Sequence, residues 1–126
     1  MEKTVAYIFG NDDNPGIYGT VYFTGGKREE VRISVDLHGL GDDLWGWAIF
    51  RDMLLPYYLP VLVPDNGISK TTFTTNSFTV RDTVGKRLIL TKGTWLYNAD
   101  RLLLEDCDLS AVIKLVLKGK CYYNER

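Results

Sequence analysis

The 126-residue sequence predicts an all-β fold, a barrel or sandwich of seven or eight short strands, in a single domain covering residues 1–126. Short runs of β-branched and aromatic residues recur along the chain, and clusters of Gly, Asn, Asp and Pro separate them. Hydrophobic residues make up 45% of the chain, which suffices for one complete core. The sequence contains no internal repeat and no low-complexity segment.

The first half of the chain contains four predicted strands. They are expected at residues 5–9, 17–23, 31–37 and 44–50, with turn signals at 10–16, 25–27 and 39–43. The third strand alternates apolar and polar residues, which is typical of a strand with one buried face. The fourth strand is apolar almost throughout, so we expect it to be covered on both faces.

The second half of the chain predicts less regular strands. Residues 54–64 contain three prolines, which argue against a helix and against a central strand. Residues 70–80 are rich in Thr and are expected to be extended, and residues 86–91 are another predicted strand. Residues 109–117 fit either a strand or a helix, and their β-branched content favours the strand. The last residues, 118–126, are expected to form a mobile tail.

Charge and cysteine content limit the classes of partner. The net charge of −1 gives no basic field, so a nucleic acid is not expected as partner. The apolar run near the N-terminus is too short for a signal peptide or a membrane span, so we expect a cytoplasmic protein without a membrane partner. Cys107 and Cys121 fit free thiols in a reducing compartment, and a disulfide between them stays open as an alternative.

Three segments, in order along the chain, carry a family resemblance. Residues 31–50 resemble the copper-site hairpin of the Cu,Zn superoxide dismutases, in which a strand and a Gly-Leu turn precede Leu-His-Gly-Phe-His-Val-His. Residues 16–23 are similar to the family's second strand, and residues 83–91 resemble its Ile-Gly-Arg-x-Leu-Val-Val-His strand. The resemblance covers roughly the first ninety residues and implies a Greek-key barrel.

The resemblance also locates the positions at which the family holds copper and zinc. The copper-site histidines fall on four residues that cannot ligate copper in the ordinary way, namely Trp45, Ala48, Phe50 and Thr91. The metal loop is shortened to residues 51–66, which contain no histidine or cysteine for zinc. The resemblance therefore implies a protein without a metal cofactor that does not catalyse dismutation.

Several aromatic and titratable residues have two interpretations. Trp45, Trp47 and Phe50 could line a pocket where the copper would sit, but aromatic residues on an apolar strand are more often core. Tyr57 and Tyr58 could anchor an interface, and the alternative is that their segment closes one end of the barrel. Cys107 is flanked by carboxylates, which should raise the pKa of its thiol and argues against a nucleophile.

The function implied by this resemblance is protein binding without catalysis. The partner would be a second copy of the chain, a host superoxide dismutase or the copper chaperone that serves it. The family's dimer patch falls on Val84 and Gly85. Similar compact, metal-site-deficient proteins are carried by poxviruses, which implies a viral protein in the host cytoplasm or the virion. The alternative function is a structural or assembly component of a virus particle.

Overall fold

Nine strands, one short α-helix and two 3-10 helices make up the computed structural model, which describes residues 2–25, 30–50, 56–117 and, as backbone only, 120–122. The strands are β1 (Lys3–Phe9), β2 (Tyr18–Gly25), β3 (Val31–His38), β4 (Trp45–Phe50), β5 (Tyr57–Leu62), β6 (Ser69–Thr75), β7 (Arg87–Lys92), β8 (Leu109–Leu117) and β9 (Lys120–Tyr122). The helical segments are α1 (Val80–Thr83), η2 (Trp95–Asn98) and η3 (Leu104–Asp106).

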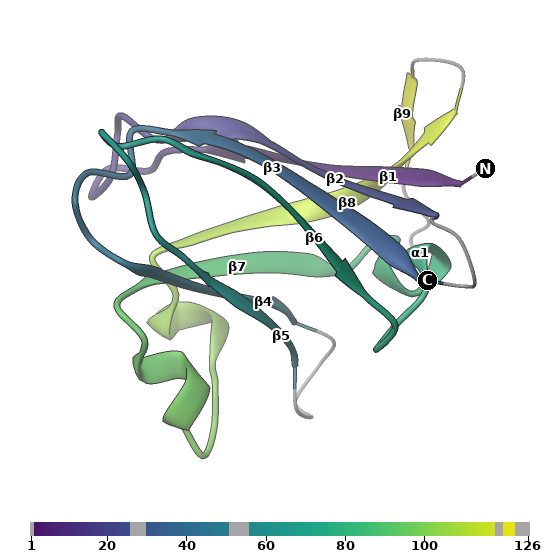
Figure 1. Ribbon diagram of the computed structural model, residues 1–126. Helices are drawn as coiled ribbons and strands as arrows, with labels where there is room; N and C mark the ends of the chain where they lie inside the picture. The colour runs from purple at the N-terminus through teal and green to yellow at the C-terminus, as the bar shows by residue number, and fades with distance from the viewer. Residues whose placement is uncertain (1, 26–29, 51–55, 118–119, 123–126) are drawn as a thin grey trace.

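The strands form a nearly closed antiparallel barrel. Their spatial order is β5-β4-β7-β8-β1-β2-β3-β6, and β9 adds to β8 outside this path. The β3–β4 and β6–β7 connections join strands that are not neighbours in the sheet, as in a Greek key. Figure 1 shows two layers, with β1, β2, β3 and β6 in one and β4, β5 and β7 in the other, while the long strand β8 joins them. The predicted fold class is confirmed.

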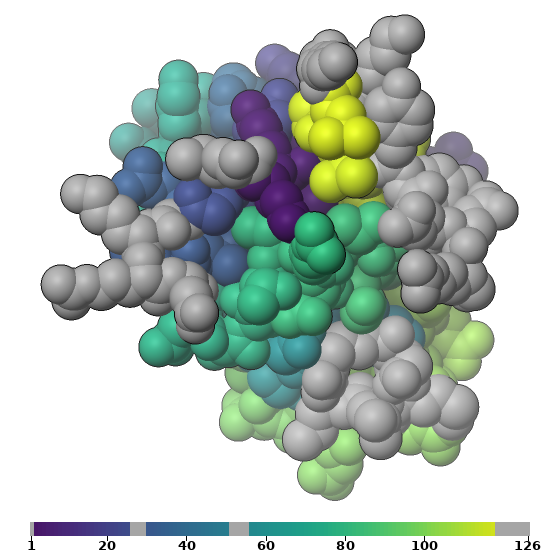
Figure 2. All heavy atoms as spheres, turned by 90° about the vertical axis from the view of Figure 1, so that its right-hand side faces the viewer, coloured from purple at the N-terminus to yellow at the C-terminus, as the bar shows by residue number. Residues whose placement is uncertain are grey.

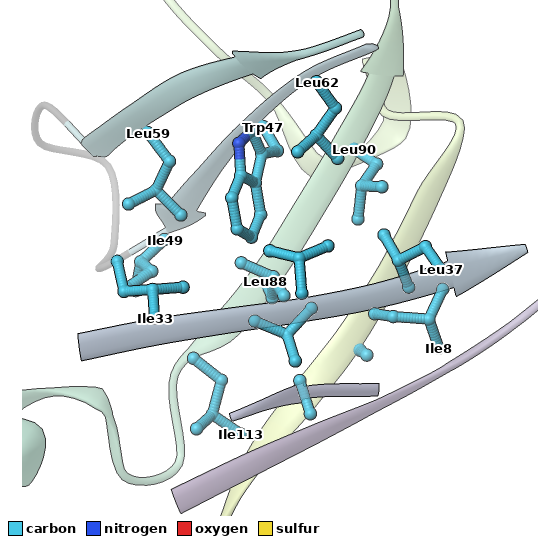
Figure 3. Close-up of a cluster of buried hydrophobic side chains, with 14 of the residues drawn as sticks. Ile8, Ile33, Leu37, Trp47, Ile49, Leu59, Leu62, Leu88, Leu90 and Ile113 are labelled. Carbon is cyan, nitrogen blue, oxygen red and sulfur yellow. The ribbon is translucent and has the colours of Figure 1, made fainter. Parts of the chain in front are cut away.

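A single apolar core fills the space between the two layers. Alternate residues of each strand point inward, as the pleat of a β-strand requires, and Figure 3 shows side chains from both layers meeting there. The largest fully buried side chains of this core are Trp45, Trp47, Phe23, Ile8, Ile33, Leu37, Leu40, Ile49, Leu62, Leu88 and Leu90. Every residue of β4 except its last is buried, as its apolar sequence predicts.

The prolines of residues 54–64 agree with an edge position. β5 is the end strand of the order and pairs only with β4, which is where a strand tolerates proline, because the unpaired edge needs no N–H there. The other end strand, β6, faces β5 across the open seam of the barrel. Residues from both strands line a hollow of about 600 Å³ at this seam.

Two expectations for the second half of the chain are wrong. The extended segment expected at residues 70–80 ends at Thr75, and Val80–Thr83 is a helical turn whose capping box joins Thr79 and Asp82. The expected tail at 118–126 contains β9, whose backbone pairs with Leu115–Leu117 of β8. The rest of that expected tail, residues 118–119 and 123–126, lies outside the described residues. No helix within the described residues is long and apolar enough to cross a membrane.

Candidate functional site

The candidate site is the outer face of β4 and β7, opposite the main core. Gly46 pairs with Thr91, Ala48 with Ile89 and Phe50 with Arg87. Because side chains alternate along a strand, these six residues share one face of the sheet. Three of the four residues that the family resemblance assigns to copper-ligand positions, Ala48, Phe50 and Thr91, are therefore on the same side of two neighbouring strands.

Trp45, the fourth of these residues, lies on the opposite face. Its side chain is fully buried in the main core with Trp47 and Ile49. The indole Nε1 of Trp45 donates a hydrogen bond to the carbonyl of Leu40, at 3.0 Å. Trp45 thus anchors the β3–β4 connection from inside the barrel and does not meet the other three residues.

A second apolar cluster covers the outer face. Leu96 from η2 and Leu102 pack on Ala48 and Ile89, and Phe50, Tyr97 and Cys107 border them. A Cβ built on Gly46 would come within 2.2 Å of Leu96 Cδ2, so the absence of a side chain at Gly46 makes room for Leu96. The segment after β7 therefore closes this face with leucine side chains.

Tyr97 ties this cover to the sheet. Its hydroxyl donates to the carbonyl of Leu59 at 2.6 Å and accepts from the backbone N–H of Trp47 at 3.3 Å. Burial raises the pKa of the Tyr97 hydroxyl above its ordinary value. The hydroxyl is therefore a structural link between η2, β4 and β5.

Comparison with solved structures finds the same architecture in superoxide dismutases. A variant of Candida albicans superoxide dismutase 5 matches with a TM-score of 0.67 at 15% identity over 95% of this chain and 96% of that chain. Its copper(II) form gives 0.64 at 15% identity, covering 94% and 95%. The clock protein EA4 gives 0.64 at 14% identity, covering 88% and 92%. No family model and no curated protein sequence matches this chain.

The chain has the superoxide dismutase fold. At this level of identity the likeness concerns the fold, and the chemistry of the site depends on the residues present.

The side chains on this face of the dismutase-like barrel do not fit a copper ion. Ala48 and Phe50 offer no donor atom, and Leu96 occupies the space beside Gly46. Copper that cycles between oxidation states needs imidazole or sulfur ligands. The described residues contain no group of three or more His, Cys, Asp or Glu side chains that could hold a metal ion. Residues 51–55, which follow β4, lie outside the described part of the chain.

Cys107 contributes a thiol at the border of the cluster. Burial, together with the neighbouring carboxylates of Asp106 and Asp108, raises the pKa of this thiol to about 11. Its Sγ is 3.5 Å from the carbonyl of Leu103, to which it donates. Cys107 is a free thiol, and its side chain is half-buried. It is protonated near neutral pH and is not poised as a nucleophile or as a metal ligand.

The residues expected at an interface lie apart from one another. Val84 and Gly85 follow α1 and line an open groove at one end of the barrel. Tyr57 packs against Phe78 with ring centroids 4.9 Å apart, next to the main core. Tyr58 is partly exposed on the outer face beside Tyr97, with ring centroids 5.8 Å apart. Neither tyrosine lines the groove.

The roles of Leu96, Tyr97 and Leu102 were not inferred from the sequence. The family resemblance ends after Gly93, and short apolar pairs such as Leu102-Leu103 do not by themselves say which surface they cover. The apolar character of Ala48 and Phe50 was the available signal, because an apolar outer face on a strand requires a cover.

The buried hydroxyl of Thr91 allows a test of how apolar this face of the sheet is. Thr91 is fully buried, and its Oγ1 is the one buried side-chain polar atom without a hydrogen-bond partner in the described part of the chain. We expect Thr91→Val to raise the free energy of unfolding by about 1 kcal/mol, because the substitution keeps the shape and removes an unsatisfied hydroxyl. Urea unfolding followed by circular dichroism measures the change.

The matched control is Thr83→Val. Thr83 is also fully buried, but its Oγ1 donates to the carbonyl of Val80 at 2.6 Å and lies 2.8 Å from Thr4 Oγ1. The same substitution should here lower the free energy of unfolding by about 1–3 kcal/mol, since it leaves two buried groups unpaired. Equal destabilisation by both substitutions would mean that Thr91 has a polar partner after all.

Proposed function

We propose that this protein is a non-catalytic, protein-binding module built on a superoxide dismutase-like barrel. The observation that carries the proposal is the apolar closure of the outer face of β4 and β7. Leu96 and Leu102 pack on Ala48 and beside Phe50, two of the residues that the family resemblance assigns to copper-ligand positions. With leucine packed on this face, the described residues there offer no donor set for a redox metal.

The second support for the proposal is a concave surface elsewhere on the barrel. Val84 and Gly85, the residues at the family's dimer patch, lie in an open groove of about 880 Å³. A concave surface with apolar side chains is a common feature of binding sites. The partners to consider are those implied by the family resemblance, which are a second copy of this chain, a superoxide dismutase and its copper chaperone.

The first arm of the test concerns catalysis. The purified full-length protein is incubated with copper and zinc, freed of excess metal, and assayed for bound metal and for superoxide dismutation. We expect less than one copper ion per chain and no rate above that of buffer, with a copper-loaded active dismutase as positive control. One copper per chain together with dismutation would overturn the proposal.

The second arm concerns binding. Size-exclusion chromatography with light scattering measures the mass of the protein alone and after mixing with a superoxide dismutase or a copper chaperone. We expect one stable complex: a dimer of the protein alone, a complex with the superoxide dismutase, or a complex with the copper chaperone. A monomer at all concentrations that forms a complex with neither protein would contradict binding to the partners proposed here.

A further inference from the structure

The groove that contains Val84 and Gly85 lies where three parts of the chain meet. Figure 2 shows this end of the molecule, where the start of β1, the α1 region and the end of β8 come together. Its lining side chains fall into a charged set and an apolar set. The basic residues are Arg81, Lys86 and Arg87; the apolar residues are Phe50, Val84, Leu104, Leu115 and Leu117. We call this surface the basic groove.

The wall of the basic groove is fixed to the barrel by hydrogen bonds. The N–H of Gly85 donates to the carbonyl of Ile113, and the N–H of Ile113 donates to the carbonyl of Lys86, both at 2.8 Å. These bonds hold the turn after α1 against β8. The groove is therefore built before a partner arrives, which reduces the ordering cost of binding.

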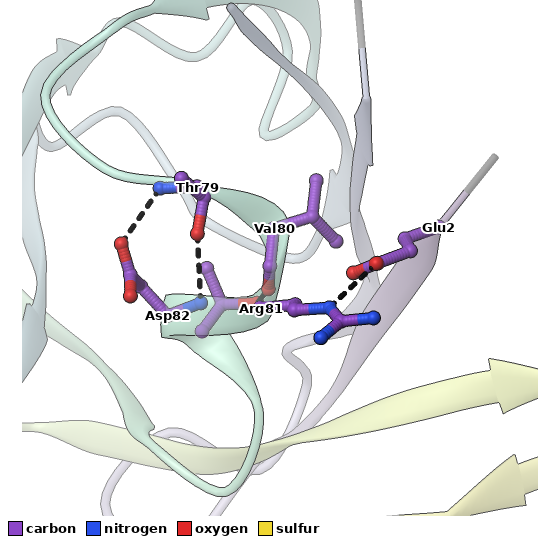
Figure 4. A network of polar contacts seen from close by, with 6 residues as sticks. Glu2, Thr79, Val80, Arg81 and Asp82 are labelled. Atoms are coloured by element: carbon purple, nitrogen blue, oxygen red, sulfur yellow. Dashed lines mark hydrogen bonds and ion pairs between the residues drawn. The ribbon is translucent and has the colours of Figure 1, made fainter. Parts of the chain in front are cut away.

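α1 is held to β1 in the same way. Thr4 Oγ1 and Thr83 Oγ1 are 2.8 Å apart in the buried contact between the two elements. On the surface, Arg81 Nε donates to Glu2 Oε1 at 2.7 Å. Figure 4 shows this ion pair beside the capping box of α1. The position of Arg81 is thus set by the buried contact between Thr83 and Thr4 and by its own ion pair with Glu2.

The charges of the basic groove do not balance. Among the described residues, three cationic side chains line it against one carboxylate, that of Glu2, which is already paired with Arg81. Lys86 and Arg87 form no ion pair within the part of the chain that the structure describes. The whole chain has a net charge of −1. The groove is therefore a local excess of positive charge on a protein whose total charge is slightly negative. A partner with negative charge complements this surface.

The same imbalance argues against a symmetric dimer through this groove. In a two-fold interface the same patch of both copies meets itself. Arg81, Lys86 and Arg87 of one copy would then approach the same three cations of the other. Like charges placed together at an interface cost several kcal/mol. A different protein is therefore a better occupant than a second copy.

The apolar side chains decide what kind of anionic partner fits. Leu104 is 39% exposed and Leu117 is 54% exposed. Phe50, opposite Arg87 on the neighbouring strand, connects these leucines to the apolar cluster on the outer face. A nucleic acid or a free phosphate would neutralise the cations and leave the leucines in water. A peptide with alternating acidic and apolar side chains would cover both.

We propose that the basic groove binds an extended segment of another protein in which acidic and apolar residues alternate. This inference rests on the proposed binding function and names the chemistry of its partner. Carboxylates of the segment pair with Lys86 and Arg87, while its apolar side chains pack on Leu104, Leu115 and Leu117. The affinity falls with added salt, because exposed charge pairs are screened.

The test uses fluorescein-labelled eight-residue peptides and fluorescence anisotropy with the full-length protein. The probe alternates Glu and Leu; the comparison peptides alternate Lys and Leu, or Glu and Gly. We expect saturable binding of the Glu–Leu peptide, at least about tenfold tighter than either comparison peptide. A single-stranded oligonucleotide of the same net charge is measured in parallel, and its tighter binding would overturn the proposal in favour of a nucleic acid.

Two variants locate the binding site. The Lys86→Glu, Arg87→Glu double variant should weaken the Glu–Leu peptide by at least about tenfold, and Leu117→Ser should weaken it by several-fold. The matched control is Lys70→Glu, an exposed charge reversal on β6 in the seam at the other side of the barrel. Circular dichroism spectra of all variants exclude unfolding. Equal binding by wild type and the double variant would overturn the proposal.

The outcomes separate this inference from the proposed function. If a dismutase or chaperone complex forms and the double variant retains it, protein binding stands and the basic groove is not its site. If the protein holds copper and dismutates superoxide, the proposed function is wrong, whether or not the Glu–Leu peptide binds. If light scattering shows a dimer that Leu117→Ser dissociates, the groove pairs two copies and the heterologous partner is wrong.

Discussion

Replacing Trp47 by alanine should lower the free energy of unfolding by about 3–5 kcal/mol. The Trp47 side chain is fully buried in the main core, where its ring lies 6.1 Å from that of Phe73. Its indole Nε1 donates to the carbonyl of Pro60 on the edge strand β5. The substitution therefore leaves a cavity between the two layers and removes a link to β5. Because small domains have only about 5–15 kcal/mol in total, this loss is a large fraction of the free energy of unfolding.

The control for this prediction is Trp47→Phe. Phenylalanine keeps an aromatic ring in the core and removes the Nε1 hydrogen bond to Pro60. We expect a loss near 1–2 kcal/mol, since Pro60 is exposed and water can reach its carbonyl. Urea unfolding monitored by far-ultraviolet circular dichroism gives both values. A loss below about 1 kcal/mol for Trp47→Ala would mean that Trp47 does not pack as the structure has it.

Gly39→Ala is the second change with a large expected effect. Gly39 has φ of +79°, and a Cβ at this position would lie 2.0 Å from the carbonyl oxygen of Gly16. The obstacle is backbone, which cannot rotate away like a flexible side chain. The substitution therefore forces the β3–β4 connection away from the turn before β2. We expect a loss of more than about 2 kcal/mol from the left-handed conformation and the steric contact together.

Gly41→Ala separates these two contributions. Gly41 has a similar φ of +68°, but a Cβ there would meet nothing within 4 Å. Its substitution should cost only the conformational part, near 1 kcal/mol. Thermal and urea unfolding of both variants, compared with wild type, measure the difference. Equal losses at Gly39 and Gly41 would show that the contact with Gly16 is not tight.

Most strands could be predicted because their residues carry local signals. β3 alternates apolar and polar residues and has one buried face, as expected. β4 is apolar throughout and is covered on both sides. The prolines of residues 54–64 excluded a central strand, and β5 is an edge strand. In each case the residue type itself restricts the backbone or the burial, so a short stretch of sequence suffices.

Other elements could not be predicted because they depend on distant parts of the chain. α1 is a single turn held by its capping box and by the contact of Thr83 with Thr4, 79 residues away in sequence. β9 exists through its pairing with β8. Isolated segments of three or four residues have no stable structure of their own. Their local sequence therefore contained too little information.

The features of the candidate site also fall into those that depend on single residues and those that depend on distant contacts. That Ala48 and Phe50 carry no donor atom and Thr91 no imidazole follows from the sequence alone, because the chemistry of a side chain does not depend on the fold. The three-dimensional fold was needed to show that Trp45 faces the core, that Leu96 covers Gly46, and that Arg81, Lys86 and Arg87 share a groove with Leu117. These are contacts between residues far apart in the chain, and the register of the strands sets them.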